Sequence, residues 1–176
     1  MPIFNHIRTV RSAVIAAAFV MLFVIPAAAQ ETTTFSDPNV EYSFEVPDAR
    51  WKMTAKPTAT NANVEYVYVD RRDAHLEVRK ISVASSVPMA DVLRDEEQKL
   101  KFMPGYVAGK EESISGKLNG SVFNFEFVRA GRPMAGRFYF LRSGNSVYIM
   151  RFTGLRDKLR SVRHNADRMA RTFAVS

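Results

Sequence analysis

Three strand-like runs followed by an amphipathic run, all between residues 120 and 175, constrain the fold more than any other part of the chain. Phe123, Phe125 and Phe127 alternate with other residues, which is the period-two pattern of a strand with one buried face. Short breakers containing glycine separate the runs, which cover residues 121–128, 134–141 and 146–152. Because such breakers are too short for a parallel crossover, the three strands are predicted to be antiparallel neighbours.

The amphipathic run, residues 155–173, predicts one long closing helix. Its apolar residues are spaced four, three, four, three and four apart and so fall on one narrow stripe. They are Leu155, Leu159, Val162, Ala166, Met169 and Phe173. A helix with one apolar stripe that follows three paired strands is expected to lie across their sheet.

The N-terminal segment, residues 1–29, has the pattern of a secretory signal peptide. Basic residues precede an apolar run at 13–25, and small residues at 27–29 offer a cleavage site after Ala29. The apolar run is shorter than the roughly 20 residues of a membrane span. We therefore expect cleavage near Ala29 and export to the bacterial periplasm or beyond. The alternative is that residues 13–25 stay uncleaved and anchor the protein in the inner membrane.

The rest of the chain is predicted to be a flexible lead-in at 30–34 and one domain at 35–176. It contains no cysteine, so disulfides and thiolate metal sites are excluded. Further strands are expected at 40–46, 64–69, 75–83 and 106–114, and a helix at 85–103. Trp51 is expected in a loop that closes one end of the core. Glu96 is expected on the solvent-exposed face of the helix. The fold class is therefore α+β, with an antiparallel sheet of about six to seven strands covered by two main helices.

Two segments resemble the PsbP-like superfamily. Residues 42–47, followed by Trp51, are similar to its opening strand. Residues 148–152, then Thr153 and Gly154, then a helix ending near Phe173, are similar to its closing strand and helix. The resemblance implies an α/β/α sandwich that serves as an accessory or binding module, and it brings no shared catalytic residues.

Catalytic patterns are absent from the sequence after residue 29. Nucleophilic catalysis needs a nucleophile, a base and an orienting acid, yet only His75 and His164 remain as imidazole bases. No phosphate-binding glycine loop, HExxH or zinc-finger spacing occurs. We therefore predict a protein that is not an enzyme and that uses no cofactor and no metal.

A basic face on the closing helix is the candidate binding surface. It consists of Arg160, Arg163, Arg168 and Arg171. One interpretation is a site for lipid headgroups or an acidic protein, and the other is an ordinary solvated face. Nucleic acid is not an expected partner, because no aromatic stacking positions share this face.

Two functions of different class follow. The first is an exported, monomeric, non-catalytic accessory domain that binds an envelope protein or an anionic envelope component through an exposed patch, without a deep pocket. The alternative is a small-molecule carrier or hydrolase that uses a cavity between helix and sheet. That cavity would gather polar groups such as Asn124, Glu126 and Arg137.

Overall fold

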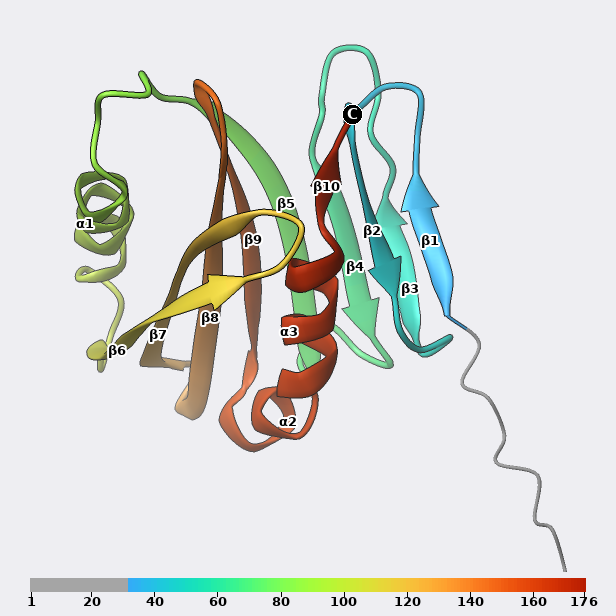
Figure 1. Cartoon of the computed structure of the whole chain (residues 1–176). Coiled ribbons are helices and arrows are strands. Elements are labelled where there is room, and N and C mark those ends of the chain that lie inside the picture. Colours follow the sequence, from blue (N-terminus) through green and yellow to red (C-terminus); the bar gives the residue numbers. More distant parts are fainter. Residues whose placement is uncertain (1–31) are drawn as a thin grey trace, which may run out of the picture.

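A seven-stranded antiparallel sheet forms the centre of the computed structural model, which describes residues 32–176 (Figure 1). Long runs of β-branched and aromatic residues favour these strands. In spatial order they are β3 (Trp51–Ala55), β4 (Val64–Tyr68), β5 (Ala74–Ser82), β9 (Ser146–Leu155), β8 (Arg132–Ser143), β7 (Asn119–Arg129) and β6 (Val107–Ser115). The predicted antiparallel sheet of six to seven strands is confirmed.

The two faces of this sheet have different covers. One face carries a three-stranded sheet and two helices (Figure 1). These elements are β1 (Thr33–Ser36), β2 (Tyr42–Val46), β10 (Ala174–Val175), α2 (Arg156–Ser161) and α3 (Arg163–Thr172). The other face carries α1 (Met89–Leu100). The described residues therefore contain three helices rather than the two that were predicted, and a small sheet that was not predicted shares the layer of α2 and α3.

Each face has its own hydrophobic core. On the side of α2 and α3, Tyr139, Tyr148 and Phe152 of the large sheet pack with the apolar stripe that was predicted for the closing helix. On the side of α1, the core holds Phe125 and Phe138 with other apolar residues of β7, β8 and β9. The predicted alternation is confirmed in β7, where Phe123, Phe125 and Phe127 are buried in the core beside α1 and Glu126 and Val128 are exposed. Strands β8 and β9 are buried on both faces.

The closing helix was predicted as one continuous element, and this is wrong. Strand β9 continues to Leu155, which packs in the core beside α1, and the helical segment divides at Val162. Val162 has φ −104° and ψ 11°, outside the α-helical range. The division lets α2 lie on β8 and β9 while α3 packs against β2. The predicted stripe is confirmed from Leu159 to Phe173, which are buried in one core, but Leu155 was wrongly included in it.

Three local predictions were also wrong. Trp51 begins strand β3 opposite Tyr68 instead of lying in a loop, although it is buried at the end of the core as expected. Strand β1 begins at Thr33, inside the predicted lead-in, because it pairs with β2. Glu96 faces the sheet and is buried, where Arg79 of β5 and Lys99 neutralise it. Neighbouring strands decide all three positions: β4 pairs with Trp51, β2 pairs with β1, and Arg79 of β5 pairs with Glu96.

The predicted signal peptide at 1–29 and the alternative anchor at 13–25 lie outside the described residues. Within residues 32–176, none of the helices has the length and apolar character needed to cross a membrane.

Glu41 links the small sheet to the large one, and its charge should make stability depend on pH. Its carboxylate accepts a hydrogen bond from Tyr148 at 2.6 Å and pairs with Lys80 at 2.6 Å. Lys80 and then Tyr148 lower the pKa of Glu41 from 4.5 to about 2. Because the pKa is lower in the folded state, this contribution to stability is complete above pH 4.5 and is lost as the pH falls toward 2.

Glu41→Gln should therefore reduce the free energy of unfolding at pH 7 by up to about 1 kcal/mol, since the pair is partly exposed. The variant should also lose less stability than the parent protein between pH 4.5 and 2. Urea unfolding at several pH values measures this difference. Glu111→Gln is the control, because Glu111 is exposed and has no ion pair within residues 32–176. Equal pH dependence in the two variants would contradict this role of Glu41.

Candidate anion-binding site

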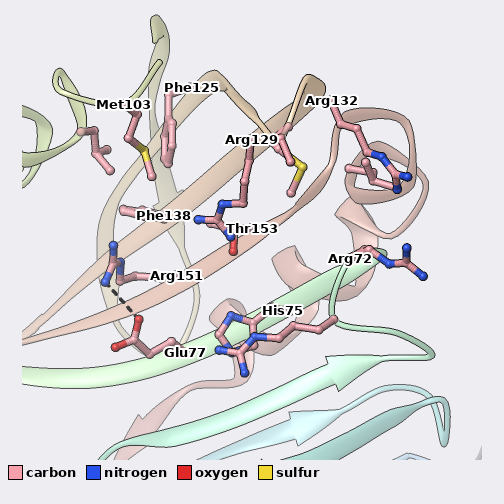
Figure 2. A pocket seen from close by; sticks show the side chains of 15 residues that line it. Arg72, His75, Glu77, Met103, Phe125, Arg129, Arg132, Phe138, Arg151 and Thr153 are labelled. Carbon is pink, nitrogen blue, oxygen red and sulfur yellow. Dashed lines mark hydrogen bonds and ion pairs between the residues drawn. The ribbon is translucent and has the colours of Figure 1, made fainter. Parts of the chain in front are cut away.

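A pocket opens where α1 leaves part of the sheet uncovered. It has a volume of about 580 Å³ and lies between the end of α1, the β7–β8 hairpin, β5 and β9 (Figure 2). Its apolar lining consists of Leu100, Met103, Phe125, Met134, Phe138 and Leu155, with Ala130 at the hairpin. The Phe125 ring can lie over β8 because its ladder partner is Gly136, where a Cβ atom would lie 2.0 Å from the ring.

The polar lining of the pocket is strongly basic. It contains one carboxylate, Glu77, together with His75, Thr153 and five arginines. The arginines are Arg71, Arg72, Arg129, Arg132 and Arg151. We call this site the arginine pocket. Arginine remains charged at any physiological pH, so the lining carries a net positive charge.

Three of these arginines already have anionic partners. Arg151 pairs with Glu77 at 3.0 Å, and its guanidinium lies over the Phe138 ring, 4.8 Å from the centroid. Burial lowers the pKa of Arg151, and the nearby Glu77 opposes that shift. Arg71 pairs with Glu65 at 3.4 Å, and Arg72 pairs with Asp70 at 3.2 Å.

Arg129 and Arg132 differ from the other three. They flank the two-residue turn of the β7–β8 hairpin and lie directly opposite each other in the ladder. The turn residues Ala130 and Gly131 have φ 49° and 71°, which corresponds to the tight hairpin turn with two positive φ angles. Within the described chain, neither arginine has a carboxylate partner; Arg129 only lies over the Phe127 ring. Two like charges directly opposite each other in a ladder are destabilising.

His75 lines the pocket without the contacts of a catalytic base. Its Nε2 lies 2.9 Å from a carboxylate oxygen of Glu65. Among residues 32–176 no serine, threonine or tyrosine hydroxyl is hydrogen-bonded to His75. The other histidine among residues 32–176, His164, is exposed on α3.

The polar residues predicted for a cavity lie on the opposite face. Asn124, Glu126 and Arg137 line a separate cleft of about 430 Å³ under α2. Arg137 is only 7% exposed and is fully engaged. It donates to Asn124 Oδ1 at 2.6 Å, to Tyr139 Oη at 2.7 Å and to Asp167 Oδ1 at 2.8 Å. Tyr139 donates to the same Asp167 oxygen, and burial raises its pKa. This network fastens α3 to the sheet and leaves Arg137 without a free donor direction for a ligand.

The predicted basic face of the closing helix is also largely occupied. Arg163 pairs with Glu112 at 3.1 Å, and Arg168 pairs with Glu45 at 3.0 Å. Arg171 donates to the backbone oxygen of Ser115 at 2.6 Å. Arg160 is exposed and has no such partner within residues 32–176. The anionic-partner surface on these four residues stays a prediction, but three of them hold the helix to neighbouring strands.

Comparison with known proteins identifies the fold. No protein-family model and no curated protein matches the sequence. Solved structures do match it. The cyanobacterial PsbP protein CyanoP of Synechocystis sp. PCC 6803 is 12% identical and has a TM-score of 0.60, over 86% of this chain and 96% of its own. The Ran-binding protein Mog1p of Saccharomyces cerevisiae is 10% identical with a TM-score of 0.61, over 83% and 96%.

LpqN of Mycobacterium tuberculosis, involved in cell envelope biogenesis, is 15% identical with a TM-score of 0.51, over 83% of this chain and 91% of its own. The resemblance found in the sequence is confirmed: this chain has the fold of the PsbP-like superfamily. At these identities the likeness establishes the fold alone.

The electrostatic repulsion between the two arginines at the hairpin can be tested directly. Arg132→Glu places a carboxylate opposite Arg129 and should raise the free energy of unfolding by about 0.2–1 kcal/mol. Urea unfolding measures the gain, which should shrink in 1 M salt because exposed charges are then screened. Arg132→Gln is the matched control and should give a smaller gain. A loss of stability in Arg132→Glu at low salt would show that Arg132 makes a stabilising contact instead.

Proposed function

We propose that this protein is an exported, non-catalytic binding domain that holds an anionic component of the cell envelope in the arginine pocket. The observation that carries the proposal is the opposed pair Arg129 and Arg132, which stands at the edge of a concave pocket without a counter-charge. An anion bound at these arginines would offset their like charge and accept charge-assisted hydrogen bonds.

The remaining geometry supports binding over catalysis. The pocket concentrates cations, whereas His75 has Glu65 as a neighbour and no nucleophile in contact. The fold likeness is in keeping with a binding role, because Mog1p is described as Ran-binding and LpqN as involved in cell envelope biogenesis. The accessory domain was expected to have no deep pocket, so the pocket brings this proposal closer to the carrier alternative. Hydrolysis has no support from the site.

Binding can be tested with inorganic pyrophosphate as the probe. NMR signals of the arginine Nε–H groups should shift for Arg129 and Arg132 as pyrophosphate is added. Arg132→Glu should weaken binding by about 10- to 100-fold, because a hydrogen bond to a charged group contributes about 1.5–3 kcal/mol.

The matched control for this titration is Arg160→Glu, which makes the same charge change at an exposed, unpaired arginine on α2. It should leave the affinity nearly unchanged. Equal weakening in both variants would show diffuse attraction to a basic protein, and shifts confined to Arg160, Arg163, Arg168 and Arg171 would place the site on the helical face instead.

Export is a separate part of the proposal and rests on the sequence of residues 1–29. Fractionation of cells that express the full chain should place the protein in the periplasm or medium, and mass spectrometry should show Gln30 as the first residue. Ala29→Leu should block processing, because the cleavage site requires a small residue. A full-length native protein in the inner-membrane fraction would instead support anchoring by residues 13–25.

A further inference from the structure

We propose that the ligand of the arginine pocket is a single-chain anionic amphiphile, with its phosphate or carboxylate head at Arg129 and Arg132 and its hydrocarbon chain on the aromatic and methionine lining. This inference rests on the proposed function and specifies the ligand of the same site. It is carried by the combination, in one pocket, of two unpaired arginines with an apolar lining whose aromatic rings lie away from Arg132.

The aromatic rings of the lining lie away from the unpaired arginines, whereas Met134, two residues after Arg132 on β8, and its ladder partner Leu155 lie next to the hairpin. Figure 2 shows Met103, Phe125 and Phe138 grouped toward one end and Arg132 toward the other, with Arg129 between them. A small inorganic anion at the arginines would leave the apolar end in contact with water. A pocket of about 580 Å³ is in the range of sites for whole organic ligands, roughly 300–1,000 Å³.

The cation at the apolar end is already neutralised. Arg151 pairs with Glu77 and stacks on Phe138, so it offers a flat surface with little net charge. A hydrocarbon chain can lie against such a surface, whereas a second anionic group would meet the Glu77 carboxylate. This arrangement favours one head group and one chain over a ligand with charges at both ends.

An exposed aromatic side chain adjoins the pocket lining in the sequence. Phe102 directly precedes Met103 and is 89% exposed, although most large apolar side chains of the described residues are buried. Lys101 precedes it and is also exposed. A chain longer than the pocket, or the surface of an anionic bilayer from which the amphiphile comes, would cover the Phe102 ring.

A series of alkyl phosphates tests the inference on the unmodified protein. Inorganic phosphate, butyl phosphate and octyl phosphate are titrated by calorimetry below the micelle concentration. A fully buried methylene tightens binding about fourfold, from about 0.8 kcal/mol. The pocket is open on one side, so octyl phosphate should bind at least about tenfold more tightly than butyl phosphate.

Two variants distinguish the contribution of the ligand's head group from that of its hydrocarbon chain. Met103→Ser should reduce the gain from chain length and leave inorganic phosphate binding unchanged, while Arg132→Glu should weaken all three ligands. Met53→Ser is the matched control for the first, because Met53 is an exposed methionine on β3 outside the pocket. Thermal unfolding checks that each variant is folded, and the chain-length series itself needs no variant.

The possible failures are distinguishable. If anions bind at Arg129 and Arg132 but octyl phosphate gains nothing over butyl phosphate, the amphiphile is wrong and the anion site stands. If no anion binds there, or if octanol binds as tightly as octyl phosphate, the proposed function fails as well.

The source of the amphiphile is tested with vesicles of phosphatidylglycerol. Sedimentation with these vesicles that is lost in Phe102→Ser supports delivery from a bilayer. Binding of octyl phosphate without any sedimentation supports a free amphiphile.

Discussion

Burial of β8 and β9 on both faces is the constraint on which the rest of the structure depends. Phe138 and Tyr139 point in opposite directions from adjacent positions of β8, and both are fully buried. Such strands are stable only if each face of the sheet has its own apolar cover. The chain meets this requirement unequally, with α2, α3 and a small sheet on one face and α1 alone on the other. The arginine pocket is the part of the second face that α1 does not reach.

Charge neutralisation distinguishes that pocket from the other polar clusters of the described chain. Where an arginine is deeply buried, as Arg137 is, carboxylate and hydroxyl groups surround it. Arg151 at the apolar end of the pocket likewise has Glu77. Arg129 and Arg132 occupy paired positions of the hairpin ladder with no such partner among residues 32–176. Like charges at paired ladder positions are expected to be destabilising, and locally unfavourable arrangements of this kind are found at functional sites.

Much of the fold could be predicted from the sequence because the signals are local. The alternation of Phe123, Phe125 and Phe127 and the stripe from Leu159 to Phe173 depend only on strand and helix periods. The small sheet could not be predicted, since β1 and β10 are short and pair with β2 from opposite ends of the domain. The burial of Glu96 could not be predicted for the same reason, because its ion-pair partner Arg79 lies on another element, β5.

The site escaped prediction for a related reason. Its arginines come from the β4–β5 turn, the β7–β8 hairpin and β9, so no stretch of sequence shows them as a group. The helical run after Leu155 has its arginines close together in the sequence, so the anionic-partner surface was predicted there. A run of basic residues in a sequence does not show how many of the charges are left unpaired in the fold. Arg163 and Arg168 form ion pairs with carboxylates of β6 and β2. Within the arginine pocket, Arg129 and Arg132 are the two lining arginines without a carboxylate partner among residues 32–176, so their charge is the least compensated there.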